Sequence, residues 1–469
     1  MGNPDMTSGG AQSPPGALPR ARASTVPTAR LVAGKVLART LRDGAYAAAV
    51  LDTELGRAAQ LDARDRALAT ELVYGALRMR AFLDAELARG SSRGKLNLDP
   101  ETHAHLLVCG FQLFGLDRVP AFAAVSEAVS LVRRARGERV ASFANAVLRR
   151  LSERAAKTTV EQRVEAQVAS APEWLRAALD RALGAESAHA FLVSATAGAP
   201  VCLRVASPDR RPRVAARIRE LAPGAVVTEG TISPLAVLVA GAGDPRALLA
   251  ELASSAERVA IQEEGSQAIA LSLGVVPGER VLDACAGRGN KTAVLAMALG
   301  ARGEGGCDAA DVHPSKLARL RAELDAQELR LRDTFAVDWS LGAGDATGPY
   351  DAILVDAPCT GVGTLRRRPD LWARRTPEAL SDLARLQASI LARTARLLAP
   401  GGRLVYSVCS VLQEEAEDVV EGVLAGQSAW LERAPFSGGV FEPGVSSVRL
   451  LPHVHGTDGY FVASLRRPA

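Results

Sequence analysis

Three kinds of segment are missing from this sequence of 469 residues, and each absence excludes a class of protein. No apolar run reaches the roughly 18 residues that a membrane-spanning helix needs. The N-terminal segment lacks the apolar stretch of a secretory signal, and its Pro, Gly and Ser content predicts a disordered tail over residues 1–27. The six cysteines form no C-x-x-C pair, so we expect a cytoplasmic protein with neither a structural metal nor disulfides.

Lysine and aromatic residues are also scarce. Only five of the 56 basic residues are lysine, so a run of arginines carries little weight by itself, whereas a lysine kept inside a motif carries more. The formal net charge of +4 allows an anionic partner without requiring one. An aromatic content of 4% disfavours a broad surface on which bases stack.

The hydrophobic pattern divides the chain into three parts. Residues 28–152 are predicted to be helical, because apolar residues recur at i, i+3, i+4 and i+7 from Val125 to Val132 and from Val140 through Phe143 to Val147. Residues 153–255 mix short strand candidates with a helical stretch, which predicts a small α+β connector. Residues 256–469 alternate strands and helices. The expected fold class is therefore an all-α N-terminal domain, an α+β connector and a C-terminal α/β Rossmann-like domain.

A glycine-containing loop follows the strand candidate ERVLDA. The loop CAGRGNKT and the apolar helix after it have the strand, turn and helix order of a nucleotide site. A phosphate-binding P-loop needs Gly directly before its Lys, where this chain has Asn290, so an NTPase is disfavoured. Asp311, about 20 residues further on, is placed to accept hydrogen bonds from ribose hydroxyls. Asp308 is the alternative, because GEGGCDAAD is a poor strand. Asp338 follows the next strand and is placed to accept from an adenine amino group.

Two cysteines stand at the carboxyl ends of predicted neighbouring strands. Cys359 follows YDAILVDAP and Cys409 ends RLVYSVC, so both are expected beside the nucleotide loop. Cytosine C5 is not nucleophilic, but a thiolate that adds to C6 turns the ring into an enamine able to attack an electrophilic methyl group. A second thiol can assist the departure of the first. The alternative is two small core residues, which is the role we assign to Cys109, Cys202 and Cys307.

These motifs together resemble those of the Sun-type RNA cytosine-5 methyltransferases, in the bacterial 16S ribosomal RNA branch that has a NusB-like helical domain in front. In the helical part the resemblance rests on ELVYGALR, RVPAFAAVSEAV and FANAVLRRL. In the C-terminal part it rests on IQEEGSQA, DACAGRGNKT, DAPCTGVG, RRRPDLW, YSVCS and DGYFVASL. It covers nearly everything after Thr28.

The resemblance implies S-adenosylmethionine as the methyl donor. It implies that Cys409 is the nucleophile and that Cys359 aids product release. By the same resemblance, the cofactor contacts come from Cys285, Ala286, Gly287, Arg288, Gly289, Asn290, Lys291, Asp311, Asp338 and Asp356. Asp356 can instead face the cytosine edge, and the sequence leaves both roles open.

The cofactor loop departs from the family's pattern. Members commonly read Ala-Pro-Gly-Gly-Lys where this chain has Gly287, Arg288, Gly289, Asn290 and Lys291. Because Asn tolerates positive φ better than other non-Gly residues, we expect the turn to survive at Asn290. Arg288 is expected to weaken cofactor binding. The usual Thr before the nucleophile is Val408 and the usual Asn after the double Glu is Ala416, and neither change removes a reacting atom.

Clusters of arginine predict contacts with RNA phosphates. One cluster, Arg366, Arg367 and Arg368, follows the Cys359 loop. A second predicted footprint, on the helical part, consists of Arg133, Arg134, Arg136, Arg139, Arg149 and Arg150. Solvated arginines are the alternative for both. We expect a monomer that acts on small-subunit ribosomal RNA. The alternatives are the same chemistry on transfer RNA, and a non-catalytic RNA-binding assembly factor whose altered loop has lost the cofactor.

Overall fold

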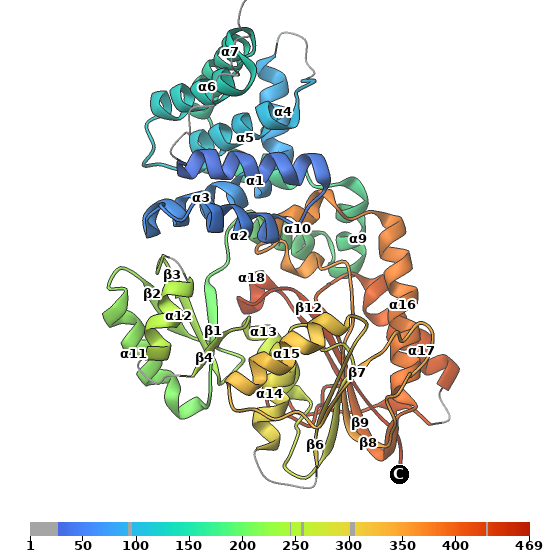
Figure 1. The fold of residues 1–469 in the computed structure, drawn as a ribbon. Coiled ribbons are helices and arrows are strands. Elements are labelled where there is room, and N and C mark those ends of the chain that lie inside the picture. The colour runs from blue at the N-terminus through green and yellow to red at the C-terminus, as the bar shows by residue number, and fades with distance from the viewer. Residues whose placement is uncertain (1–26, 92–95, 244, 255–257, 301–304, 428–429) are drawn as a thin grey trace, which may run out of the picture.

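The computed structural model describes residues 27–91, 96–243, 245–254, 258–300, 305–427 and 430–469. The tail predicted for residues 1–27 lies outside these ranges except for its last residue. Figure 1 shows a helical domain above two lower units, a small one built around β1–β4 and a larger one built around β5–β12. The fold class expected from the sequence is confirmed.

The N-terminal domain consists, within the described residues, of helices only: α1 (Ala29–Asp43), α2 (Ala47–Arg57), α3 (Ala63–Arg78), α4 (Arg80–Gly90), α5 (Pro100–Gly115), α6 (Ala121–Arg136) and α7 (Glu138–Ala155). N-cap side chains stabilise the first turn of several of these helices. At the start of α3, Asp62 accepts a hydrogen bond from the Asp65 backbone N–H at 2.7 Å. α5 lies at the centre of the bundle and packs against α1, α3, α6 and α7. Its buried apolar residues, from Ala104 to Phe114, belong to one continuous core.

The predicted apolar face of α6 is buried, but the one predicted for α7 is rotated. Val125, Val129 and Val132 lie in the core as expected. In α7 the buried positions include Ala144 and Val147, whereas Phe143 is 39% exposed. The expectation for Phe143 was wrong, because Leu148 and Leu151 extend the buried stripe one position away from it.

Three further helices, α8 (Val160–Ala169), α9 (Glu173–Leu183) and α10 (Ala185–Ala195), join the helical domain to the α/β domain. Their apolar side chains share a core with Val362, Leu365 and Val411, which come from the loops after the two cysteines. Arg78 at the end of α3 also donates to the Arg366 backbone oxygen at 3.0 Å. The cysteine loops are therefore supported from the N-terminal side of the chain.

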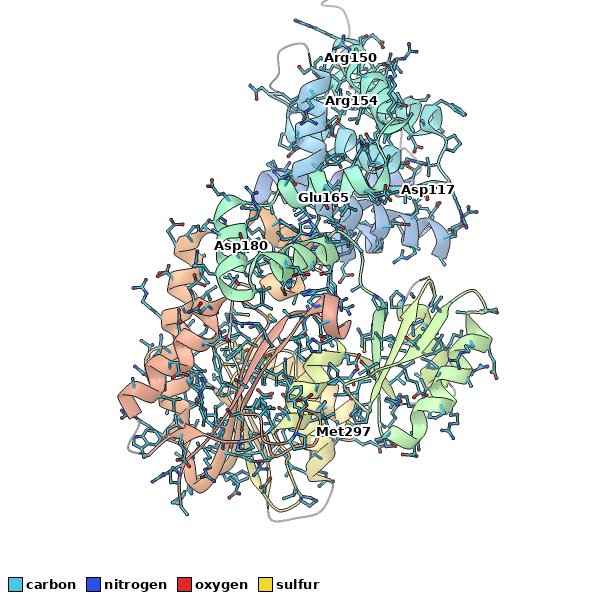
Figure 2. The ribbon with its side chains drawn as sticks, turned by 180° about the vertical axis from the view of Figure 1, so that it is seen from behind. Asp117, Arg150, Arg154, Glu165, Asp180 and Met297 are labelled. Carbon is cyan, nitrogen blue, oxygen red and sulfur yellow. The ribbon has the colours of Figure 1, made fainter. Side chains whose placement is uncertain are left out.

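The small α+β unit has a β-α-β-β-α-β order. It comprises β1 (Val201–Val205), α11 (Arg211–Leu221), β2 (Val226–Glu229), β3 (Ala236–Ala240), α12 (Pro245–Ser254) and β4 (Val259–Ile261). Its strands are antiparallel in the order β2-β3-β1-β4, the arrangement of a split β-α-β fold. Met297 of the neighbouring α/β domain packs against the core of this unit, at the boundary that Figure 2 shows.

The α/β domain is built on five parallel strands in the order β7-β6-β5-β8-β9, extended by the antiparallel β12. These strands are β5 (Arg280–Asp283), β6 (Gly306–Asp311), β7 (Asp333–Ala336), β8 (Tyr350–Asp356), β9 (Leu398–Val408) and β12 (Tyr460–Arg466). Two short strands, β10 (Glu432–Arg433) and β11 (Ser447–Leu450), pair with β12. The glycine-rich segment judged a poor strand does form β6, because the sheet buries it on both faces.

Helices cover both faces of this sheet. α13 (Glu264–Ser272) and α14 (Asn290–Leu299) pack on one face, and α16 (Pro377–Ala395) and α17 (Glu417–Gln427) on the other. α15 (Pro314–Ala326) packs beside β6 and β7, and the short α18 (Pro452–His455) contacts α10. The strand order reverses between β5 and β8, the point at which open α/β sheets bind ligands. No helix in the described ranges is long and apolar enough to cross a bilayer.

Candidate active site

Both predicted cysteines lie at the carboxyl edge of the parallel sheet, close to each other. The Sγ atoms of Cys359 and Cys409 are 3.2 Å apart, within hydrogen-bonding distance for two thiols. Neither forms a disulfide, and both side chains are partly exposed. Cys109, Cys202 and Cys307 are buried elsewhere, as expected for core residues.

Glycines allow the two cysteine loops to approach each other. The Gly363 N–H donates to the Cys409 backbone oxygen at 3.0 Å, and the Gly459 N–H donates to the Gly363 oxygen at 2.8 Å. A Cβ on Gly363 would lie 1.9 Å from the Gly459 oxygen, so no larger residue fits there. Gly361 has a φ of +75°, and a Cβ on it would lie 4.0 Å from the Cys409 sulfur. The loop sequence CTGVG therefore places one thiol directly over the other.

The surroundings of Cys359 favour its protonated form. Its hydrogen bond to the Cys409 sulfur, its burial and the negative charges of Cys409, Glu415 and Asp356 all raise its pKa well above the ordinary value. Cys359 therefore keeps its proton and can donate it toward Cys409.

Lys291 forms an ion pair with Asp356. Its Nζ lies 2.7 Å from Asp356 Oδ2, and its side chain is only 11% exposed. Burial would lower the pKa of Lys291, but Asp356 and, to a smaller extent, Cys409 raise it above the ordinary value. The Ser407 hydroxyl donates to the other Asp356 oxygen at 2.9 Å. A cation is thus fixed near Cys409, on a carboxylate at the end of β8.

The glycine-containing loop and Asp311 lie together at the ends of β5 and β6. Asp311 is 8% exposed and accepts hydrogen bonds from the backbone N–H groups of Gly287 (3.2 Å) and His313 (2.8 Å). Lys316 Nζ is 3.3 Å from the same carboxylate. A Cβ on Gly287 would meet nothing closer than 3.9 Å, so open space faces this part of the loop.

Asp308, the alternative to Asp311, is a structural residue. It is fully buried and accepts hydrogen bonds from the Tyr350 hydroxyl (2.9 Å) and from Arg332 Nε (3.1 Å). It therefore cannot reach a ligand at the carboxyl edge. Asp338, after β7, is exposed there, and bonds from the side chain and backbone of Ser340 lower its pKa.

One expectation about the altered loop requires correction. Asn290 does not need positive φ, because it is the first residue of α14; the left-handed positions are Gly287 (+57°) and Gly289 (+82°). A Cβ on Gly289 would lie 2.7 Å from Leu320, so that glycine is required for two reasons. Arg288 is exposed. The remaining loop residues, Cys285 and Ala286, are half-buried and buried beneath the loop.

Sequence reasoning missed three residues at this site. Asp283 ends β5 and is 1% exposed; its Oδ2 accepts from the Thr292 hydroxyl at 2.7 Å, and burial raises its pKa to about 6. Val312, directly after Asp311, exposes 51% of its surface. Glu415 is a fully buried carboxylate behind the Cys359 loop. The strand-end position of Asp283 was visible in ERVLDA, but nothing in the sequence indicates the burial of Glu415.

The prediction that Arg366 and Arg367 grip RNA phosphates is wrong. Arg366 is buried, and its Nε lies 2.6 Å from Asp458 Oδ1. Arg367 Nε lies 3.0 Å from Asp458 Oδ2, and its Nη1 donates to the Pro200 oxygen at 2.8 Å. Both guanidinium groups therefore hold the loop to the start of β12 and to the small unit. Arg368 is exposed and stays a candidate for contact with RNA.

The second arginine footprint is exposed but partly paired within the protein. Arg133 pairs with Glu138 at 2.6 Å, and Arg136 pairs with Asp99 at 2.9 Å. Arg150 donates to the Gly90 oxygen and lies at the end of the helical domain farthest from the α/β domain (Figure 2). The other members, Arg134, Arg139 and Arg149, are exposed.

As for metals, the described side chains include no group of three or more His, Cys, Asp or Glu placed to bind an ion.

Comparison with known proteins adds two family matches. Residues 270–466 match the family described as 16S rRNA methyltransferase RsmB/F, and residues 27–153 match the NusB family. A methyltransferase of Mycobacterium tuberculosis is 35% identical to this chain over 467 residues, covering 94% of this chain and 96% of its own length. Ribosomal RNA small subunit methyltransferase B of Xanthomonas campestris is 32% identical over 444 residues, with 93% and 96% covered.

Solved structures share the fold as well. The crystal structure of PH0851 is similar with a TM-score of 0.74, covering 93% of this chain and 98% of its own, at 23% sequence identity. At that identity the likeness concerns the fold.

Proposed function

The chain belongs to the RsmB/F family of 16S rRNA methyltransferases and carries a NusB-family domain in front, and from this membership we propose that it methylates C5 of a cytosine in small-subunit ribosomal RNA, with Cys409 as the nucleophile. One observation carries the choice of chemistry. The sulfurs of Cys359 and Cys409 lie 3.2 Å apart at the strand ends beside the nucleotide loop. Methyl transfer to an oxygen or to an exocyclic nitrogen needs no thiol, whereas transfer to C5 needs a nucleophile at C6.

The residues at the switch point fit S-adenosylmethionine. We assign the ribose hydroxyls to Asp311, the adenine amino group to Asp338 and a face of the adenine ring to the exposed side chain of Val312. The loop from Cys285 to Lys291 and the start of α14 line the remaining space. When bound, the cofactor supplies an electrophilic methyl group on a sulfonium. The side chain of Arg288 is exposed and not packed into the loop, which supports an active enzyme over a factor that has lost its cofactor.

Cys409 starts the reaction in this proposal. Its thiolate adds to C6 of the cytosine, and the electron pair of the C5–C6 double bond makes C5 nucleophilic. The Lys291 ammonium, which the charge of Cys409 already influences, stabilises the thiolate before it attacks. After methylation, loss of the C5 proton and cleavage of the C6–S bond restore the ring. Cys359 assists that departure, because it holds a proton next to the leaving sulfur.

Of the two roles left open for Asp356, we propose contact with cytosine. Each carboxylate oxygen accepts up to two hydrogen bonds, and Lys291 and Ser407 occupy one on each side. The remaining positions suit the exocyclic amino group, the only donor on the Watson–Crick edge of cytosine. The Lys291 ammonium is then beside the N3 and O2 acceptors of the same base. A uracil in this place would set a carbonyl oxygen against Asp356 and be rejected.

We propose that the exposed arginines Arg134, Arg139, Arg149 and Arg368 contact RNA phosphates. Small-subunit rRNA is favoured over tRNA by the NusB-family domain and by the full-length relatives named for that substrate. The test is direct: the purified chain is incubated with labelled S-adenosylmethionine and either in vitro transcribed 16S rRNA or unmodified tRNA, and nucleosides are identified by mass spectrometry. We expect 5-methylcytidine in the rRNA reaction. Label in another nucleoside, or in tRNA alone, would refute the proposal.

A further inference from the structure

A buried polar network lies directly behind the Cys359 loop, and its hydrogen bonds have no role in the chemistry above. Its centre is Glu415, in the 3-10 helix η4 (Gln413–Glu415) that follows the Cys409 loop. The carboxylate of Glu415 is fully buried and accepts three hydrogen bonds. The donors are the Thr360 backbone N–H (2.7 Å), the Thr360 hydroxyl (2.5 Å) and Gln387 Nε2 (3.0 Å). Thr360 is the residue that follows Cys359.

The same network holds the residue on the other side of Cys359. Gln387 Nε2 donates to the Pro358 backbone oxygen at 2.9 Å, so the peptide units before and after Cys359 are both tied to one buried cluster. Tyr406 of β9 completes the cluster, because its hydroxyl donates to the Glu415 backbone oxygen at 2.7 Å. Gln387, Tyr406 and Glu415 are each fully buried. The Cys359 backbone is therefore fixed from behind, while its sulfur faces Cys409.

The charge of Glu415 has no counter-ion in the described part of the chain, where no basic group lies within salt-bridge distance of it. Burial of a carboxylate without a cation costs free energy, which the three donors offset only in part. A neutral glutamine would be the less costly way to fill the same space. The negative charge also lies close enough to Cys359 to disfavour a second negative charge there. The charge of Glu415 therefore favours the protonated form of the Cys359 thiol.

We propose that Glu415 is a positioning residue for the release step, which holds the Cys359 S–H in line with the sulfur of Cys409. The inference rests on the proposed function, since it assumes a covalent bond between Cys409 and C6. In release, water takes the proton from C5, and the C5–H electron pair forms the C5–C6 double bond. The C6–S bond breaks, and its electron pair stays on the Cys409 sulfur. That sulfur accepts the hydrogen bond of the Cys359 thiol.

The test compares Glu415→Gln with the matched control Glu414→Gln. Glu414 is the adjacent residue, but its carboxylate pairs with Arg181 of α9, where its Oε1 lies 2.6 Å from Arg181 Nη2. Each purified variant is mixed with labelled 16S rRNA and S-adenosylmethionine, and protein–RNA adduct is counted on denaturing gels. For Glu415→Gln we expect first-turnover methylation within about threefold of the wild type. We also expect at least tenfold more adduct and at least tenfold slower steady-state turnover. Glu414→Gln should match the wild type.

Several results separate this inference from the function it rests on. A folded Glu415→Gln that releases RNA at the wild-type rate, or that loses the first turnover together with the adduct, overturns the role of Glu415. A variant that is merely less stable attacks RNA more slowly and forms less adduct in the same proportion, so the adduct does not accumulate. If Glu415→Gln does not fold, Thr360→Val removes one of the three hydrogen bonds, and the absence of adduct from that variant overturns the inference. If Cys359→Ala itself traps no RNA, the two-cysteine mechanism fails instead.

Discussion

Replacement of Asp283 by Asn should stabilise the protein, by an amount that depends on pH. Asp283 is 1% exposed, its Oδ1 has no hydrogen-bond partner among the described residues, and burial raises its pKa from the ordinary 3.8 to about 6. Below about pH 4 the carboxyl is protonated in the folded and unfolded states alike. Between about pH 4 and 6 only the unfolded state ionises, so the folded protein loses stability as the pH rises. Above about pH 6 the folded state must also hold the charge, and the full penalty is present.

The size of the penalty follows from the shift. About two pKa units correspond to roughly 3 kcal/mol at pH 8, and the penalty at pH 5 is smaller by about 1.4 kcal/mol. Asn retains an acceptor for the Thr292 hydroxyl and carries no charge. Urea unfolding followed by tryptophan fluorescence measures the gain in unfolding free energy at pH 5 and at pH 8. Asp345→Asn, an exposed position in the same domain, is the matched control. A gain that is equal at the two pH values, or a loss of stability at pH 8, would refute the reasoning.

Three further substitutions test the assigned roles. Lys291→Arg should lower the rate of single-turnover methylation at least tenfold, because the planar guanidinium group does not fit where the Lys291 ammonium lies 2.7 Å from Asp356. An unchanged rate would contradict the role given to the Lys291 ammonium. Asp311→Ala should raise the cofactor dissociation constant about tenfold or more in calorimetry, because a charge-assisted hydrogen bond is lost. If Asp308→Ala raises it instead, the ribose hydroxyls belong to Asp308 and the assignment to Asp311 is wrong. Arg366→Ala should lower the free energy of unfolding by about 1.5 to 3 kcal/mol, because Asp458 loses one charged donor but still pairs with Arg367, and it should leave RNA affinity intact in filter binding. Weaker RNA binding at unchanged stability would restore the discarded role in phosphate contact.

Several strand ends were predictable because the strand is a short apolar run followed by its functional residue. This pattern placed Asp356, Cys359 and Cys409 at the carboxyl edge of the sheet, whereas Asp311 was placed by its spacing from the glycine-containing loop. A segment of this sheet can form a strand without a high intrinsic β-propensity. The segment that forms β6, Gly306–Asp311, contains one glycine and two aspartates, and only its burial between β5 and β7 makes it a strand.

Partners far apart in the sequence were not predictable. Arg366 is separated from Asp458 by 92 residues, and Thr360 from Glu415 by 55. Local pattern cannot tell a buried arginine or glutamate from a solvated one, because the partner that makes burial possible comes from another element. The same limit misplaced Phe143, where a shift of one position along the helix decides between core and surface.

The central claim, that Cys409 attacks and Cys359 assists release, is tested most directly by trapping RNA on the two single variants. Cys409→Ala, Cys359→Ala and the double variant are each incubated with labelled 16S rRNA and S-adenosylmethionine, and adduct that survives denaturing electrophoresis is counted. The account predicts an adduct in Cys359→Ala alone, with methylation lost in Cys409→Ala and the adduct lost in the double variant. An adduct in Cys409→Ala and none in Cys359→Ala would reverse the two roles, and full activity in both single variants would remove the cysteines from the mechanism.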